Sequence, residues 1–85
     1  MLKQGETGTL YRLSVEVTNR SANPMIIYVE PWGEEFVLQP TECIRVDIIA
    51  PTFRAIPVSY GPNSITVEGW EGSVPEMWKG EDRLY

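Results

Sequence analysis

An alternating stretch decides the fold of this chain: TLYRLSVEVT, residues 9–18. Apolar and polar side chains take alternate positions in it, and the apolar set is Tyr11, Leu13, Val15 and Val17. A period of two is typical of an antiparallel strand that buries one face and exposes the other to solvent. We therefore expect a half-buried antiparallel strand over residues 9–18.

A second alternating stretch, CIRVDII, covers residues 43–49. Its polar members Arg45 and Asp47 are expected to face solvent, because they lie between β-branched apolar residues. The apolar residues are expected to form one buried stripe of the core, made by Ile44, Val46 and Ile48.

Four more segments have the composition of strands and are separated by turns rich in Asn, Pro and Gly. They cover residues 25–30, 35–38, 55–60 and 64–70. The first is expected to be a central strand, because its apolar run is less strictly alternating. Six or seven short strands at this spacing predict an all-β fold. We expect a single antiparallel β-sandwich, with a small barrel as the alternative.

One segment predicts something other than a strand. Ser73-Val74-Pro75-Glu76 has the pattern of a helix-capping box with proline in the first turn. A short C-terminal helical turn is therefore expected before Gly80. The chain is too short to divide its buried surface between two cores. Residues 1–85 are expected to form one domain, with mobile ends at 1–8 and 80–85.

The charge balance argues against nucleic acid and anionic membranes as partners. The chain has a net charge of −5, from 12 Asp and Glu against 7 Lys and Arg, and its basic residues are scattered singly. Binding to phosphate groups depends on clustered Lys and Arg that displace counterions. No stretch approaches the roughly 18 apolar residues that cross a bilayer. The single cysteine, Cys43, cannot form an internal disulfide, which is typical of a reducing, cytoplasmic location.

The sequence lacks the usual groups for catalysis and for transition-metal binding. It contains no histidine and no catalytic motif. Glu16 and Glu68 would form a carboxylate pair only if their strands were neighbours. Cys43 lies beside Glu42, which disfavours a reactive thiolate, so we expect Cys43 to be a small buried apolar residue. We therefore expect a protein that is not an enzyme and that holds no cofactor or metal.

The turn EPWGEE, residues 30–35, is the candidate partner-binding site. Trp32 would be a rigid aromatic anchor in a Pro-Gly turn, with a rim of carboxylates from Glu30, Glu34 and Glu35. In the alternative interpretation, Trp32 folds back as a lid and covers the end of the sandwich. The three carboxylates match no calcium-binding loop and are expected to be solvated.

Three functions are compatible with this composition. The first is a non-enzymatic protein-interaction or assembly module, which binds a protein partner or a second copy of itself through an exposed strand edge or the Trp32 turn. The second is an acidic inhibitor or immunity-type protein that masks a basic enzyme, which is favoured if the carboxylates converge on one face. The third is a small-ligand or carbohydrate-binding sandwich that uses Trp32, Trp70 or Tyr28 as a stacking platform.

One part of the sequence, residues 19–40, resembles a known family. Asn19-Arg20-Ser21 and Pro24 precede an apolar strand, and Gly33 and Leu38-Gln39-Pro40 follow. This run is similar to the opening strands of the β-domain of the von Hippel–Lindau tumour suppressor. The resemblance implies an antiparallel sandwich with strand connections of that kind. The hydroxyproline pocket of that family uses a histidine, which this sequence lacks, so the resemblance implies no peptide recognition here.

Overall fold

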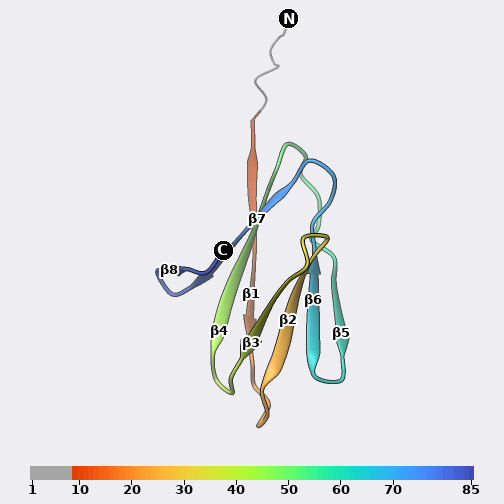
Figure 1. Ribbon diagram of the computed structural model, residues 1–85. Helices are drawn as coiled ribbons and strands as arrows, with labels where there is room; N and C mark the ends of the chain where they lie inside the picture. The colour runs from red at the N-terminus through yellow and green to blue at the C-terminus, as the bar shows by residue number, and fades with distance from the viewer. Residues whose placement is uncertain (1–8) are drawn as a thin grey trace, which may run out of the picture.

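The two alternating stretches of the sequence are neighbours in one β-sheet. In the computed structural model, which describes residues 9–85, β1 (Tyr11–Thr18) runs antiparallel to β4 (Cys43–Ala50). β7 (Val74–Lys79) pairs with the other side of β4, and β8 (Asp82–Arg83) pairs with β7. The strand order in this sheet is therefore β1-β4-β7-β8, and β1 is an edge strand (Figure 1).

The second sheet has the order β3-β2-β6-β5. It consists of β2 (Met25–Glu30), β3 (Glu34–Leu38), β5 (Val58–Gly61) and β6 (Ser64–Glu68). β2 is a central strand, as predicted, and lies between β3 and β6. It is antiparallel to β3 but parallel to β6, so the prediction of a purely antiparallel fold is wrong at this pair.

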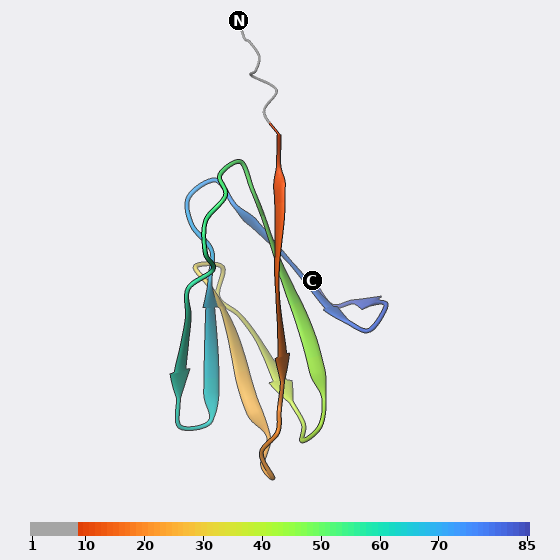
Figure 2. The same cartoon turned by 180° about the vertical axis from the view of Figure 1, so that it is seen from behind.

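The two four-stranded sheets form an all-β, sandwich-like fold. The sheets do not close on each other, so the small-barrel alternative is wrong. On one side of the molecule, β1 is the free edge of the first sheet and β5 is the free edge of the second. Residues of β1, β5 and β6 line a hollow on this side. Figure 2 shows β1 crossing in front of β4 and β7 of its own sheet, with β5 at the outer edge of the second sheet.

The core lies between the sheets and takes side chains from both. Val46 and Ile48 of β4 are 0% exposed and Ile44 is 2% exposed, which confirms the predicted stripe. The other buried members of the apolar cluster are Val17, Ile27, Val29, Leu38, Ile65, Val67 and Met77.

Val46→Ala is expected to lower the free energy of unfolding by about 1–3 kcal/mol, because it removes buried methyl groups and leaves a cavity. Val46 lies opposite Val15 on one side and Met77 on the other, and paired strands hold both neighbours in place. Equilibrium urea unfolding measures the change. Val37→Ala is the matched control, because Val37 is 60% exposed. A loss below about 0.5 kcal/mol at Val46 would contradict its place in the core.

The predicted C-terminal helical turn is wrong, because β7 occupies this segment. Residues 9–85 contain no helix, and hence none long and apolar enough to cross a membrane. The Ser73 hydroxyl accepts a hydrogen bond from the Trp70 amide at 2.9 Å and so closes a turn instead of capping a helix. Met77 is fully buried opposite Val46. The described residues form eight strands, one more than the upper limit of the prediction.

Two predictions for the outer face of β4 are also wrong. Asp47, expected to face solvent, is fully buried, and Cys43, expected to be buried, is exposed. Both side chains lie on the face opposite to the Ile44 stripe, because side chains alternate along a strand. Cys43 occupies the first position of the strand, whereas Arg12 and Arg45 cover Asp47 with ion pairs.

The remaining differences concern the ends of elements. β5 begins at Val58 rather than at residue 55, and β6 ends at Glu68 rather than at residue 70. The predicted mobile segment 1–8 lies outside the described residues. Within 80–85, β8 pairs with β7 and the Leu84 amide donates a hydrogen bond to the Met77 carbonyl at 2.7 Å. The mobility of this segment stays a prediction.

Candidate functional site

The turn between β2 and β3 holds the predicted partner-binding residues. Trp32 is partly buried and packs against the apolar core. Its ring lies so close to Gly69 that a Cβ atom on that glycine would be 2.7 Å from the ring carbon Cζ3. The Gly69 amide also donates a hydrogen bond to the Glu30 carbonyl at 2.8 Å. These contacts tie the turn to the segment after β6 and favour the lid interpretation of Trp32.

The three glutamates of this turn do not form one cluster. Glu30 Oε1 accepts a hydrogen bond from the Gly33 amide at 3.2 Å. Glu34 and Glu35 are consecutive on β3 and therefore point to opposite faces of the sheet. Within residues 9–85, no three His, Cys, Asp or Glu side chains are grouped so that they could hold a metal ion.

Two further candidates from the sequence are the Trp70 ring, which already has contacts within the chain, and the carboxylate pair, whose two members are separated. The Trp70 ring, considered as a stacking platform, donates a hydrogen bond from Nε1 to Thr52 Oγ1 at 2.9 Å. The Arg54 guanidinium lies 4.8 Å from its ring centre, so a cation–π contact already covers one ring face. Glu16 and Glu68, the possible carboxylate pair, lie in different sheets.

A buried carboxylate on the outer side of the β1-β4-β7-β8 sheet was not expected from the sequence. Asp47 accepts hydrogen bonds from Arg12 Nη1 at 2.7 Å, from Ser14 Oγ at 2.7 Å and from Arg45 Nε at 3.0 Å. Burial acts to raise the pKa of Asp47, but these hydrogen bonds outweigh burial and hold the pKa below its ordinary value. A carboxylate with a lowered pKa is a weak base, so Asp47 suits an ion-pair network better than acid–base catalysis.

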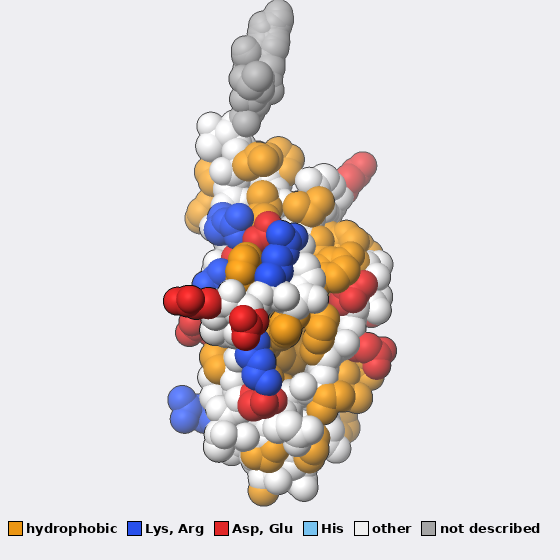
Figure 3. Space-filling view, turned by 60° about the vertical axis from the view of Figure 1, so that its left-hand side comes forward, with side chains coloured by type: hydrophobic (Ala, Val, Ile, Leu, Met, Phe, Trp, Pro, Cys, Tyr) orange, Lys and Arg blue, Asp and Glu red, His pale blue; other side chains and the backbone are white. Residues whose placement is uncertain are grey.

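The same face of the sheet carries both signs of charge. Arg12 donates a second hydrogen bond to Glu76 at 2.8 Å, and this bond is the main reason that the pKa of Glu76 lies below its ordinary value. Arg45 and Arg83 lie 5.5 Å and 5.9 Å from the ring centre of Trp78. Figure 3 shows acidic and basic side chains interleaved on the face that it presents. On this face the carboxylates are mixed with basic side chains, which does not favour the inhibitor hypothesis.

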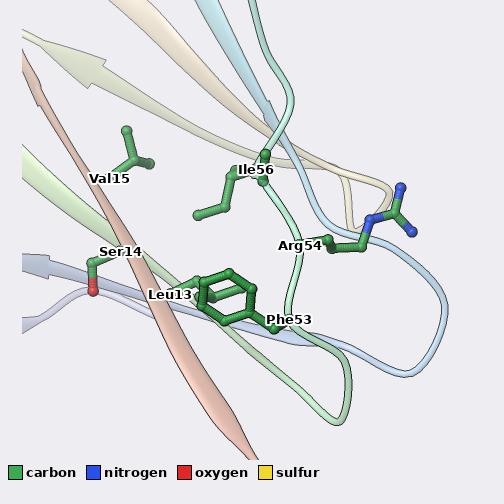
Figure 4. A pocket seen from close by; sticks show the side chains of 7 residues that line it. Leu13, Ser14, Val15, Phe53, Arg54 and Ile56 are labelled. Carbon is green, nitrogen blue, oxygen red and sulfur yellow. The ribbon is translucent and has the colours of Figure 1, made fainter.

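An apolar groove opens between β1 and the connection from β4 to β5. Its volume is about 420 Å³. In Figure 4, Ile56 extends toward β1, whereas Ser14 and Arg54 point away from the groove. The Tyr11 and Phe53 rings meet edge to face, with their centres 5.6 Å apart. The residues that line the groove are Leu13, Ser14, Val15, Phe53, Arg54, Ala55 and Ile56.

A second hollow of about 250 Å³ continues along β1 and reaches β5 and β6. Val15 lines both hollows, so they meet in one mainly apolar surface between the free edges of the two sheets, to which Glu16 and Thr18 also contribute. Phe53 is 73% exposed and Tyr60 is 77% exposed on this surface. We call it the β1–β5 seam and define it by its apolar members Leu13, Val15, Val17, Phe53, Ile56, Val58 and Tyr60.

Comparison with known proteins assigns this chain to no family. No protein-family model, curated protein or solved structure matches it. The choice between the functions considered above therefore depends on the geometry of the seam, the Trp32 turn and the charged face.

Proposed function

We propose that this chain is a non-enzymatic protein-interaction or assembly module that makes contact through the β1–β5 seam. The observation that carries the proposal is an exposed apolar groove, which includes the aromatic ring of Phe53, beside an unpaired strand edge. Contiguous exposed apolar surface on a small protein marks interaction sites. Aromatic side chains such as those of Phe53 and Tyr60 are typical of the residues that dominate binding energy.

The seam supports this function better than the Trp32 turn does. Phe53 is already exposed, so a partner would meet it without any rearrangement of the fold. Trp32 would have to leave the core and its contact with Gly69 before it could reach a partner. The set Glu30, Trp32, Glu34 and Glu35 therefore stands as the second candidate contact surface.

Composition supports the class of partner. A net charge of −5 with scattered basic residues disfavours nucleic acid and anionic lipid, and the absence of histidine from the sequence supports a role without catalysis. Cys43 is a free, exposed thiol. Because such a thiol persists in a reducing compartment, we infer a cytoplasmic location.

Phe53→Asp is expected to abolish capture of the partner from an extract of the source cell. The substitution removes an aromatic contact of the kind that is worth about 2 kcal/mol or more and adds a charge to an apolar surface. The fold is expected to survive, because Phe53 is mostly exposed. Affinity capture with the full chain measures the effect, and thermal unfolding shows that the variant is folded.

The matched control is Val37→Asp, which adds the same charge to an exposed apolar side chain of β3, an edge strand far from β5 in the strand order. This control is expected to capture the partner normally. Capture that survives Phe53→Asp would overturn the seam as the contact surface.

A further inference from the structure

The free edge of β1 differs from the other free edges of the two sheets. β1 has eight residues and contains no proline, glycine or lysine. Edge strands in natural proteins are usually short or carry such residues, because an open row of backbone groups invites pairing with another chain. Among the other described edges, β8 has two residues, β5 has four residues after Pro57, and β3 has five and opens with two glutamates. β1 is thus the longest free edge among the strands of residues 9–85, and its two charged residues, Arg12 and Glu16, have opposite signs.

We propose that β1 pairs antiparallel with β1 of a second copy of the chain, about a two-fold axis at Ser14, so that the two β1-β4-β7-β8 sheets become one. This inference rests on the proposed function and names the occupant of the seam. A two-fold interface requires a surface that complements itself. In this register Arg12 lies opposite Glu16 of the second copy, and Glu16 lies opposite its Arg12.

The charges on β1 favour this register over its neighbours. Opposite charges directly across an antiparallel pair are stabilising, and there are two such pairs when the axis lies at Ser14. An axis at Leu13 would place Arg12 opposite Ser14, and an axis at Val15 would place Glu16 opposite Ser14. Neither of these registers contains an Arg–Glu pair.

Both charged groups are available for such a contact. The Arg12 side chain is 52% exposed, although its Nη1 atom already binds Asp47 and Glu76, so it is held in place and still reachable. Glu16 forms no ion pair with another described residue. Its neighbour across the sheet, Arg45, turns instead to Asp47. The second copy would therefore supply the partner that Glu16 lacks within residues 9–85.

The apolar side of β1 gives a second reason. Leu13 and Val15 line the seam and are only partly buried in one copy. In the proposed register Leu13 lies opposite Val15 of the second copy, on the inner face. The contact between Leu13 and Val15 of the second copy would continue the apolar row between the sheets and cover part of the seam. Pairing would thus remove apolar surface of each copy from water, which stabilises the dimer.

Sedimentation equilibrium of the full chain tests the second copy. The wild type is expected to form a dimer that Glu16→Lys weakens roughly tenfold or more, because both Arg–Glu pairs become repulsive. Glu35→Lys is the matched control, since it makes the same charge change at an exposed residue of β3 and is expected to leave the dimer unchanged. A dimer that is indifferent to Glu16→Lys would overturn the register.

A cross-link tests the position of the axis. In a Cys43→Ser background, Ser14→Cys is expected to form an intermolecular disulfide on oxidation, because residues directly opposite each other have Cα atoms about 4.5–5.5 Å apart, within disulfide range. Thr18→Cys in the same background is the control, because its equivalent in the second copy lies eight positions along the pair. Thermal unfolding under reducing conditions shows whether Ser14→Cys, which loses a hydrogen bond to Asp47, is folded. Equal cross-linking of both variants would overturn the axis at Ser14.

The inference and the proposed function fail in different ways. A wild-type chain that is monomeric at several hundred micromolar would overturn the second copy. The seam would still stand as the binding site of another protein if Phe53→Asp abolished partner capture in that case. If Phe53→Asp still captured the partner and Glu16→Lys still formed the dimer, both the proposed function and the inference would be overturned.

Discussion

Asp47→Ala is expected to lower the free energy of unfolding by about 2–3 kcal/mol, because it leaves two guanidinium groups and a hydroxyl without their shared acceptor. Arg12, Ser14 and Arg45 all donate hydrogen bonds to this one fully buried carboxylate. The two arginine side chains are about half exposed, at 52% and 42%, so water can partly replace the lost partner. This replacement holds the expected cost below that of breaking a fully buried ion pair.

Urea unfolding at neutral pH measures the effect of Asp47→Ala. Asp82→Ala is the matched control, because Asp82 is an exposed acidic residue at the edge of the same sheet. The control is expected to change the free energy of unfolding by less than about 0.5 kcal/mol. An equally small change for Asp47→Ala would contradict the role of the carboxylate in joining β1 to β4.

Acidification of the same variant gives a second measurement. The folded state holds the pKa of Asp47 below its ordinary value of 3.8, so the ionised carboxylate stabilises the fold above that pH. This stabilisation is lost as the pH falls through the lower pKa of the folded state. Asp47→Ala lacks the group, so between about pH 5 and pH 2 it is expected to lose less stability than the wild type. Glu76, whose pKa is also lowered, keeps some acid sensitivity in both proteins.

The parts of the fold that depend on local alternation could be predicted from the sequence. Ile44, Val46 and Ile48 form the buried stripe because a strand places every second side chain on one face, whatever its neighbours are. The same rule places Cys43 on the outer face with Arg45 and Asp47, where Cys43 is exposed as the first residue of the strand. The expectation of burial for Cys43 came from its residue type and ignored its position in the alternation.

The burial of Asp47 could not be read from its own strand. Its acceptor role depends on Arg12 and Ser14, which lie 35 and 33 residues away in the sequence and become neighbours through the pairing of β1 with β4. A single sequence does not show the register in which β1 pairs with β4. The alternation alone places Asp47 on the solvent side of β4, whereas the pairing with β1 makes it the covered centre of two ion pairs.

The segment of β7 shows a local signal that tertiary pairing overrides. The capping pattern begins at Ser73, but Pro75 and Met77 are both buried while Val74 is exposed. This alternation has the period of a strand, and the segment pairs along β4 from Arg45 to Ile49. A one-turn helix would leave the Met77 side chain without that place in the core, so pairing prevails over the cap.

The seam could be anticipated only in outline. The sequence predicts an exposed strand edge as a contact surface, yet the identity of that edge depends on the strand order. Leu13 and Val15 have the same alternation whether β1 lies at an edge or in the middle of a sheet. Phe53 lies in a connection that carries no periodic signal, so its place beside β1 follows from the packing of that connection alone.

Trp32→Ala is expected to lower the free energy of unfolding by about 3 kcal/mol, because it removes a large aromatic side chain that packs against the core. The turn around it is held by Gly69, whose amide binds the Glu30 carbonyl. Thermal and urea unfolding measure this loss. A folded variant with unchanged stability that no longer captures the partner would instead assign Trp32 the role of an exposed anchor, with the rim of Glu30, Glu34 and Glu35.

A double-mutant cycle with Gly69 separates the two roles of Trp32 most sharply. Gly69→Ala alone is expected to cost about 1–3 kcal/mol, because its methyl group has no room beside the indole ring. A Cβ atom there would lie 2.7 Å from Trp32 Cζ3 and 2.8 Å from Ser73 Oγ. In the Trp32→Ala background the part of this cost that comes from the indole ring is expected to disappear, whereas the contact with Ser73 Oγ remains, which gives a coupling energy of about 1 kcal/mol or more. Additive effects of the two substitutions would contradict the lid, because a ring in solvent has no contact with Gly69 to lose.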